Sequence, residues 1–356
     1  MSQHQHYRHL ALIAAMALFM QSLDATILNT ALPAISASLN ESPLEMQMTI
    51  ISYSLTVALF IPLTGWIADK YGTLNVFRAA VGIFVLGSVA CAMANSLNAL
   101  IWSRILQGMG GALMMPVARL TIIRNVPKTQ LVAAWNAMAM AGLIGPVLGP
   151  IVGGWLVTHA TWHWIFLINI PIGVLGILFA GRYMPNSTGK INKLDWRGFI
   201  LFAGGLAGVT LGLDLLSEER VNPEITTAIL STGFISFLLY YYYAKRAKNP
   251  LLPLNVFQVG TFRIGMIANI FIRLTASGIP FLMPLMLQLV FHYSADIAGW
   301  LLAPIALSSI ITKSFAGKVL ASFGYKTTLI STALSMTLAV VAMSLLHQHT
   351  GLWLLV

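Results

Sequence analysis

Two charged residues lie in apolar stretches of the sequence, where charge is costly. Asp24 stands in MQSLDATILNTALP, residues 20–33, with no basic residue nearby, and Arg104 stands in IWSRILQGMGGALMM. An ionised side chain in lipid must face water or a partner, so such a group marks a functional site by default. A carboxyl in such surroundings is also harder to ionise than one in water. Loading it with a proton on one side of a membrane and unloading it on the other is the chemistry that proton coupling needs.

Polar side chains lie close to both charges along the predicted helices. Gln21 is one turn before Asp24, Asn29 lies further along the same helix, and Gln107 follows Arg104 by three residues. We expect Arg104 to pair electrostatically with an acid such as Asp24 across the bundle. We expect Gln21, Asn29 and Gln107 to line a substrate cavity. Purely structural alternatives remain open: the carboxylate could bond a neighbouring helix, and the guanidinium could bond backbone carbonyls.

The composition places these stretches in a membrane. Hydrophobic residues make up 58% of the 356 residues, charged residues make up 8%, and the mean hydropathy is +0.81. A soluble domain would need far more polar cover. The formal net charge of +10 comes from basic residues scattered singly between apolar runs, which fits a membrane surface better than a nucleic acid. With Cys91 as its single cysteine, the chain has no disulfide framework.

Apolar runs of about 20 residues predict membrane-spanning helices, because backbone groups in lipid must be paired within their own segment. These runs are too long and too uniformly apolar for the strands of a membrane barrel. A twelfth span begins at GLWLLV, the last six letters of the sequence. The eleven complete predicted spans are residues 9–33, 47–68, 76–95, 99–124, 131–158, 162–184, 198–216, 224–244, 262–290, 295–316 and 327–346.

The charges between the spans predict their orientation. Basic residues gather at the N-terminus and in every second loop, whereas the intervening loops carry Glu41, Glu45, Glu218, Glu219, Glu224 and one basic residue, Arg220. Because positive loops stay in the cytoplasm, we expect a multi-pass protein of the bacterial cytoplasmic membrane with its N-terminus inside. Its partners would then be the lipid bilayer, a small organic substrate and protons.

Residues near the predicted membrane surfaces carry further expectations. YYYY at 240–243, followed by Lys245, is typical of an aromatic belt with a basic anchor, and Trp162 and Trp164 are expected to mark the opposite interface. Asp214, near the end of a span, is expected to extend its carboxylate toward water.

An internal repeat divides the chain. GWIADKYGTLNV begins at Gly65, and GKVLASFGYKTT begins 252 residues later at residue 317, each with apolar spans on either side. We therefore predict a six-helix bundle over 1–184, two inserted transmembrane helices with cytoplasmic flanks over 185–260, and the first part of a second six-helix bundle over 261–356. Since the repeat would continue for about 80 further residues, the sequence is expected to be a fragment with an incomplete second bundle.

Five local motifs carry a resemblance to a known family. They are LDATILNTALP (23–33), GWIADKYG (65–72), RILQGMGGA (104–112), GLIGPVLGPIVGG (142–154) and WHWIFLINIPIG (162–173). In their order and spacing the chain resembles the major facilitator superfamily and, within it, the fourteen-span drug:proton antiporter family. One departure is that no basic residue directly follows Gly72, the first being Arg78, so the charge clamp of this loop is expected to be weaker.

The resemblance implies a fold and roles for particular residues. The fold would be all-α, with two six-helix bundles and two extra central helices. Arg104 would take part in proton movement together with Asp24, and the fifth-span motif would seal the two halves during the swing. We expect the conformational latch and seal at Gly65, Asp69, Gly72, Gly145, Pro146, Gly149, Pro150 and Gly153. Arg273 would line the cavity, pair with Asp24 or bond locally; the sequence does not choose.

These features together predict a proton-coupled antiporter that exports amphipathic drugs or other small organic compounds by alternating access. A proton symporter importing a small metabolite would share Asp24 but should lack the glycine and proline motif of the fifth span. A membrane sensor or scaffold without transport predicts that Asp24 and Arg104 are replaceable. An enzyme is not expected, because no nucleophile and base cluster stands out. No cofactor and no metal site are expected, and the proton gradient would supply the energy.

Overall fold

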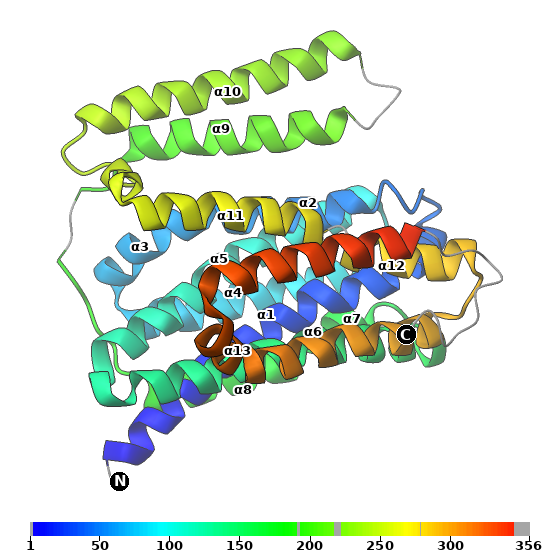
Figure 1. Cartoon of the computed structure of the whole chain (residues 1–356), viewed down its shortest axis with the longest axis horizontal. Helices are drawn as coiled ribbons and strands as arrows, with labels where there is room; N and C mark the ends of the chain where they lie inside the picture. Colours follow the sequence, from blue (N-terminus) through cyan, green and yellow to red (C-terminus); the bar gives the residue numbers. More distant parts are fainter. Residues whose placement is uncertain (1–2, 191–192, 217–221, 278, 345–356) are drawn as a thin grey trace.

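The computed structural model describes residues 3–190, 193–216, 222–277 and 279–344. Every regular element in these ranges is a helix, and most of the helices run along one common direction (Figure 1). Eight of the described helices are long and apolar enough to cross a membrane. Three of the loop residues whose charges predict the orientation of the spans lie outside the described residues: Glu218, Glu219 and Arg220. The predicted all-α membrane architecture is therefore confirmed for the described part of the chain.

The first bundle places its helices where the apolar runs predict them. Its third span follows the second after a single residue, Gly72, whose φ of +87° suits glycine. Pro62 stands at the start of a short 3-10 turn that interrupts the second span. The helices are α1 (Gln3–Leu39), α2 (Gln47–Phe60), η1 (Ile61–Leu63), α3 (Thr64–Tyr71), α4 (Thr73–Ala92), α5 (Leu97–Asn125), α6 (Lys128–His159), α7 (Trp164–Leu167) and α8 (Asn169–Tyr183).

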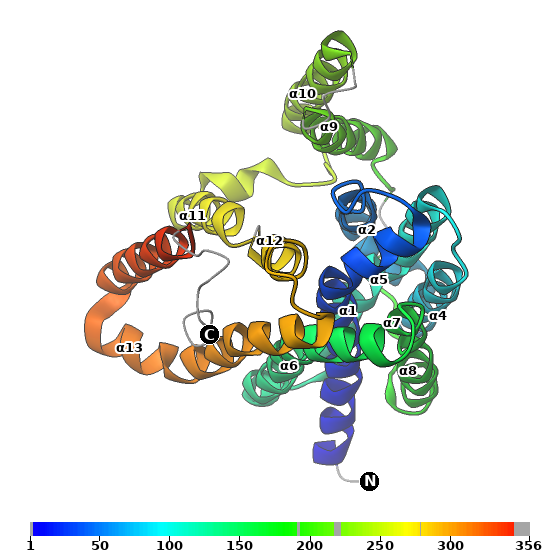
Figure 2. The ribbon, with the colours of Figure 1, turned by 90° about the vertical axis from the view of Figure 1, so that its right-hand side faces the viewer.

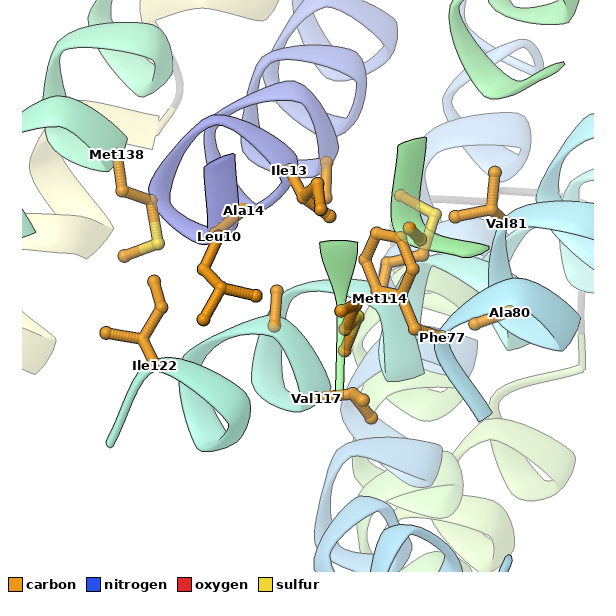
Figure 3. Packing of buried hydrophobic residues seen from close by; sticks show 14 of the residues in the cluster. Leu10, Ile13, Ala14, Phe77, Ala80, Val81, Met114, Val117, Ile122 and Met138 are labelled. Atoms are coloured by element: carbon orange, nitrogen blue, oxygen red, sulfur yellow. The ribbon is translucent and has the colours of Figure 1, made fainter. Parts of the chain in front are cut away.

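Apolar side chains from α1, α4, α5 and α6 form the core of this bundle. Leu10 of α1 lies near Ile122 of α5 and Met138 of α6, while Phe77 of α4 lies beside Met114 of α5 (Figure 3). These five side chains are all buried. Since lipid tails are as apolar as these residues, close packing rather than exclusion from water holds the helices in register. The core fixes α1 against α5, which carry the two charges singled out above.

One predicted interface residue lies inside the bundle. Trp162 is only 6% exposed and packs edge-on against Phe166, whereas Trp164 is 52% exposed. Trp162 therefore packs against protein just before the short helix α7, and of the two rings only that of Trp164 is exposed. Two tryptophans two residues apart face different directions there.

The two inserted helices form a hairpin at the edge of the molecule (Figures 1 and 2). They are α9 (Trp196–Leu215) and α10 (Pro223–Arg246). Asp214 near the end of α9 is only 8% exposed, and its carboxylate accepts a hydrogen bond from the Gln47 amide of α2 at 2.8 Å. The expectation that Asp214 extends toward water is wrong, since Gln47 supplies a polar partner inside the protein. This bond attaches the hairpin to the first bundle.

The second half begins with η2 (Leu254–Gln258), α11 (Gly260–Ser277), α12 (Ile279–Leu285) and η3 (Met286–Val290). The single predicted span over 262–290 is thus divided into several elements. Helix α13 (Ala295–Ser344) covers the next two predicted spans, and the chain reverses direction within it (Figure 2). The GLWLLV segment and the last residues of the eleventh predicted span lie outside the described residues.

Two glycines in equivalent positions of the repeat share one backbone conformation. Gly72 has φ 87° and ψ 147°, and Gly324 has φ 72° and ψ 165°. They stand at the second glycine of the two repeated motifs, where the chain leaves one helix and enters the next. Because this conformation strongly disfavours any residue with a Cβ, the repeated glycine has a direct structural reason.

Candidate functional site

The two intramembrane charges of the first bundle meet in its interior. Nη1 of Arg104 lies 2.7 Å from Oδ2 of Asp24, and each side chain is 1% exposed. The structure thus contains the pairing that the sequence suggested between α1 and α5. A carboxylate and a guanidinium in direct contact compensate each other's loss of hydration. Asp24 therefore has a protein partner and does not stand alone in lipid.

Two amides complete the surroundings of the carboxylate. Gln107 donates to Oδ1 of Asp24 at 2.8 Å, and Asn169 donates to the same oxygen at 3.2 Å. Both amides also reach the hydroxyl of Ser88 on α4, at 2.8 Å and 3.3 Å. Both carboxylate oxygens are therefore satisfied, and fixed dipoles take the place of water around the negative charge.

The guanidinium of Arg104 makes three further contacts. Its Nε donates to the Thr49 carbonyl at 3.2 Å, and its Nη1 donates to the Gln107 side-chain oxygen at 2.5 Å. Its plane lies over the ring of Tyr53, 4.3 Å from the centroid, which is a cation–π arrangement. The network around the ion pair thus draws on five helices, α1, α2, α4, α5 and α8.

Glycines allow the helices to approach closely enough for this network. A Cβ on Gly87 of α4 would lie 2.5 Å from the Gln107 backbone of α5, and one on Gly108 would lie 2.9 Å from the Tyr53 carbonyl of α2. Real Cβ contacts are longer, so larger residues would force the helices apart. The glycines of the RILQGMGGA motif therefore help to bring Gln107 within reach of Asp24 and Ser88.

Two members of the network were missed in the sequence. Asn169 lies inside WHWIFLINIPIG, which was treated only as a family marker, and Ser88 lies in an apolar span. Asn169 is fully buried, and its Oδ1 has no hydrogen-bond partner among the described residues. A signal for Asn169 was present, because it is the single amide side chain within that apolar motif. Ser88 gave none, since isolated serines are common in membrane helices.

The residues expected to line a substrate cavity lie in different surroundings. Gln107 is fully buried within the ion-pair network and does not face open space in this structure. Gln21 is half-buried, with its amide 3.5 Å from the Gly111 carbonyl, and Asn29 is 9% exposed. Arg273 of α11 is exposed and donates to Asn269 one turn away at 2.9 Å. Of the alternatives for Arg273, the structure has the local bond and not a pair with Asp24.

The expected latch residues meet at the end of the bundle that carries the N-terminus. Asp69 of α3 forms an ion pair with Arg124 at the end of α5, at 2.5 Å, with both side chains roughly one-quarter exposed. Gly72 follows with its positive φ, while a Cβ on Gly65 would meet nothing within 4 Å. Asp69 and Gly72 thus hold a structured turn, whereas Gly65 has no close approach to explain it.

A loop after α8 closes over this ion pair. The Asn186 side chain accepts a hydrogen bond from the Leu74 amide at 3.1 Å, and the Gly189 amide donates to the Asp69 carbonyl at 3.2 Å. A Cβ on Gly189 would lie 2.2 Å from the Asp69 carboxylate. Asp69 and Arg124 belong to the first bundle, and the loop directly follows it, so these contacts join the first bundle to the flank of the inserted helices.

The glycine and proline motif of α6 has two faces with different neighbours. Cβ atoms on Gly145, Gly149 and Gly153 would lie 2.0 to 2.9 Å from atoms of Ser22, Leu23, Thr26 or Ile27 on α1. Helix α6 therefore packs tightly on α1 within the first bundle along this stripe. Pro146 and Pro150 both lie inside the continuous helix α6.

The second face of α6 meets the other half of the protein. A Cβ on Gly154 would lie 2.3 Å from the Ala295 carbonyl of α13, and one on Gly299 of α13 would lie 2.3 Å from the Pro150 carbonyl. In this structure the close contact between α6 and α13 thus falls on Pro150 and Gly154. Gly145, Gly149 and Gly153 contact α1 of their own bundle. Their expected role in a seal between the halves, together with that of Pro146, stays a prediction.

Comparison with known proteins extends over almost the whole chain. The model of the Major Facilitator Superfamily matches residues 14–356. "Probable transport protein HsrA" of Haemophilus influenzae is 63% identical over 350 residues, which cover 98% of this chain and 76% of that protein. "Putative multidrug resistance protein MdtD" of Salmonella dublin is 43% identical over 326 residues, covering 92% of this chain and 69% of that protein.

Solved structures share the fold at low sequence identity. A crystal structure of a D-xylose-proton symporter matches with a TM-score of 0.60 and 14% identity, covering 88% of this chain and 69% of that chain. A crystal structure of a peptide transporter POT in complex with sulfate matches with a TM-score of 0.61 and 15% identity, covering 91% and 73%. At this identity the likeness concerns the fold alone.

Proposed function

Since the chain belongs to the major facilitator superfamily, we propose that it is a proton-coupled antiporter that exports amphipathic drugs or other small organic compounds by alternating access. Membership makes it a multi-pass membrane transporter with a small-molecule substrate. The bacterial sources of its relatives and its basic loops support a place in the cytoplasmic membrane with the N-terminus inside. Its relatives named as multidrug resistance proteins support export of organic compounds.

The observation that carries the coupling proposal is the buried ion pair of Asp24 and Arg104. A proton bound by Asp24 removes the negative charge that balances Arg104 and leaves a buried cation with only neutral partners. Such a state is costly, so it favours a rearrangement that gives the guanidinium water or another acceptor. Because the network spans five helices, a movement of the Arg104 guanidinium would shift these helices relative to one another. Binding of a proton by Asp24 would in this way be coupled to alternating access.

The substrate would bind close to the interface of the two halves. An amphipathic organic cation would meet few competing charges in the bundle, and methionine and aromatic side chains adapt to many shapes. Among the described helices, α1 contacts α12 and α13, and α6 contacts α13. The Gln288 amide of η3 also donates to the Thr30 carbonyl of α1 at 3.0 Å. Gln21, Asn29 and Arg273 remain candidates for the cavity wall.

The proposal is tested with the full-length protein reconstituted in vesicles under an imposed proton gradient. Efflux of a fluorescent lipophilic cation is compared for the natural protein, Asp24→Asn and Asp214→Asn. Asp214 is the matched control, because it is also a buried carboxylate bonded by a glutamine amide, but it forms no ion pair with Arg104. We expect gradient-driven efflux from the natural protein and from Asp214→Asn, and a loss of at least tenfold in Asp24→Asn.

Other outcomes assign other functions. Undiminished gradient-driven efflux from Asp24→Asn would remove this carboxyl from proton coupling. Movement of the compound in the same direction as the protons would indicate a symporter. A protein that moves none of a broad panel of organic compounds, while remaining folded, would favour a sensor or scaffold.

A further inference from the structure

A cavity of about 860 Å³ lies where α10 ends and the second half of the protein begins. The end of α10 and the start of α11, between which it lies, are at the end of the molecule that also carries the N-terminus (Figure 1). The end of α10, the segment 247–253, η2 and the start of α11 supply its walls. The lining residues are Tyr241, Ala244, Lys245, Ala247, Lys248, Asn249, Pro250, Pro253, Leu254, Asn255, Phe257, Gln258 and Arg263.

Hydrogen bonds hold the wall of this cavity in place. The Leu251 amide donates to the Asp195 carboxylate at 3.0 Å, and the Tyr243 hydroxyl donates to the same carboxylate at 2.6 Å. The Leu252 amide donates to the Tyr240 hydroxyl at 2.8 Å. The segment after α10 is thus anchored to both helices of the α9 and α10 hairpin. The cavity is therefore a built feature and not a gap beside a loose linker.

The charge of the cavity is of one sign. Lys245, Lys248 and Arg263 line it, and no acidic side chain is among the described lining residues. The Lys245 ammonium lies over the Tyr241 ring, 4.2 Å from its centroid. Asn249 and Asn255 add amide donors. Three cations with amides and no carboxylate form a setting for a phosphate group.

The walls are also partly apolar and continue onto the outer faces of membrane helices. Leu254 and Phe257 line the cavity, and Leu238 of α10 and Ile264 of α11 expose 54% and 66% of their surface nearby along these helices. A free phosphate ion gains no binding energy from apolar walls. A phospholipid, in contrast, packs its acyl chains against exposed apolar helix faces. Basic pockets at the cytoplasmic ends of membrane helices bind anionic lipid headgroups in this way.

We infer that this cavity binds the headgroup of an anionic phospholipid, with its phosphate held by Lys245, Lys248 and Arg263. The lipid would join the inserted hairpin to the second half of the transporter. This site lies apart from the Asp24 and Arg104 network, so the inference does not depend on proton coupling.

Native mass spectrometry of the purified full-length protein tests this site. The protein is titrated with cardiolipin, with phosphatidylglycerol and with zwitterionic phosphatidylcholine of matched chain length. The cavity variant carries Lys245→Gln, Lys248→Gln and Arg263→Gln. The control variant carries Arg78→Gln, Lys128→Gln and Lys193→Gln, which remove the same charge from exposed positions outside the cavity. Size-exclusion chromatography and thermal unfolding establish that both variants are folded.

We expect the first anionic lipid to bind the cavity variant at least about tenfold more weakly than the natural protein, as removal of three nearby cations predicts. The control variant should change by less than twofold, and phosphatidylcholine should bind weakly to all three proteins. Equal losses in both variants, or no loss in the cavity variant, would overturn the site. Displacement of the lipid by millimolar inorganic phosphate would assign the cavity to a soluble anion and overturn the lipid.

If the cavity variant does not fold, single substitutions decide the matter. Lys248→Gln alone should weaken binding of the anionic lipid, and Lys248→Arg should restore it, since arginine keeps the charge. Unchanged binding of the anionic lipid in Lys248→Gln would exclude this residue and with it the proposed site. Weaker binding that Lys248→Arg does not restore would show that the charge at this position is not what binds the lipid, and it would also overturn the proposal.

Discussion

The carboxylate of Asp24 and the guanidinium of Arg104 are 80 residues apart in sequence and in direct contact inside the first bundle, with 2.7 Å between Oδ2 and Nη1. Neither side chain has more than 1% of its surface exposed. Each charge therefore depends on the other for compensation, because both side chains are buried away from the molecular surface. This mutual dependence gives the clearest expectations for variants.

Removing either partner should destabilise the protein more than removing both. Asp24→Asn leaves a buried guanidinium without an anion, which costs about 3 to 5 kcal/mol. The double variant with Asp24→Asn and Arg104→Gln should recover most of that loss, because two neutral amides replace two charges. Thermal unfolding in detergent measures the cycle. Losses that simply add would mean that the two charges are compensated independently.

Transport should not follow this recovery of stability. In the double variant the bundle is neutral at this point and has no group that binds a proton, so gradient-driven efflux should stay lost. A double variant that is stable but inactive would show that the loss of efflux comes from the loss of proton coupling and not from unfolding. Full transport by this variant would place the proton carrier elsewhere.

The sequence revealed the charged residues of this site because a charge in an apolar run is conspicuous. Asp24 and Arg104 could be recognised one by one, and their contact followed from the need for compensation. Asn169 and Ser88 could not be placed, since uncharged polar residues occur in many membrane helices and only the packing of α4, α5 and α8 brings them to the carboxylate. The family motifs correctly indicated the fold, which rests on the positions of apolar runs.

Other sequence expectations failed where a distant partner decides the outcome. Asp214 was expected to reach water, yet Gln47, 167 residues away, bonds its carboxylate inside the protein. The glycine stripe of α6 was visible, but its period could not tell whether α1 or α13 packs against it. Which side chain or helix contacts a given residue depends on the tertiary arrangement of the helices. That arrangement could not be predicted from the pattern of a single sequence.

Asn169 should contribute to the network as a positioning residue. Asn169→Ala removes one of the two amides that bond Oδ1 of Asp24, and the loss of a hydrogen bond to a charged group costs about 1.5 to 3 kcal/mol. We expect lower thermal stability and an altered pH dependence of efflux, whereas Asn98→Ala at an exposed position should change neither. An unchanged pH profile in Asn169→Ala would leave this residue with a packing role only.

The seam between α6 and α1 should not tolerate a methyl group. In Gly149→Ala the new Cβ would lie 2.0 Å from the Thr26 hydroxyl, so the two helices must move apart, at a cost of about 1 to 3 kcal/mol. Gly176→Ala is the matched control inside helix α8, because a Cβ there meets nothing within 4 Å. Thermal unfolding should show destabilisation in Gly149→Ala and a neutral or slightly stabilising effect in Gly176→Ala. Equal stability of both variants would contradict the close seam.

The Asp69 and Arg124 ion pair should matter more for transport than for stability. Partly exposed pairs of this kind contribute about 0.2 to 1 kcal/mol, so Asp69→Asn should unfold at nearly the natural temperature. Its effect on efflux would come from a loosened turn between α3 and α4. Exchanging the charges, with Asp69→Arg and Arg124→Asp, should restore part of the lost efflux. Failure of this exchange, with the protein folded, would show that the position of the carboxylate matters beyond its charge.

The bond between Gln47 and Asp214 should hold the inserted hairpin to the first bundle. Asp214→Leu leaves the half-buried Gln47 amide without its acceptor, which costs at most about 1 to 3 kcal/mol, while Asp214→Asn still offers an oxygen to that amide. Hydrogen exchange measured by mass spectrometry should therefore become at least about fivefold faster in α9 for Asp214→Leu and stay nearly unchanged for Asp214→Asn. Helices α1 and α5 should keep their protection in both variants, because they lie on the other side of α2. Faster exchange throughout the bundle would instead assign Asp214 to global stability and remove its specific role in docking the hairpin.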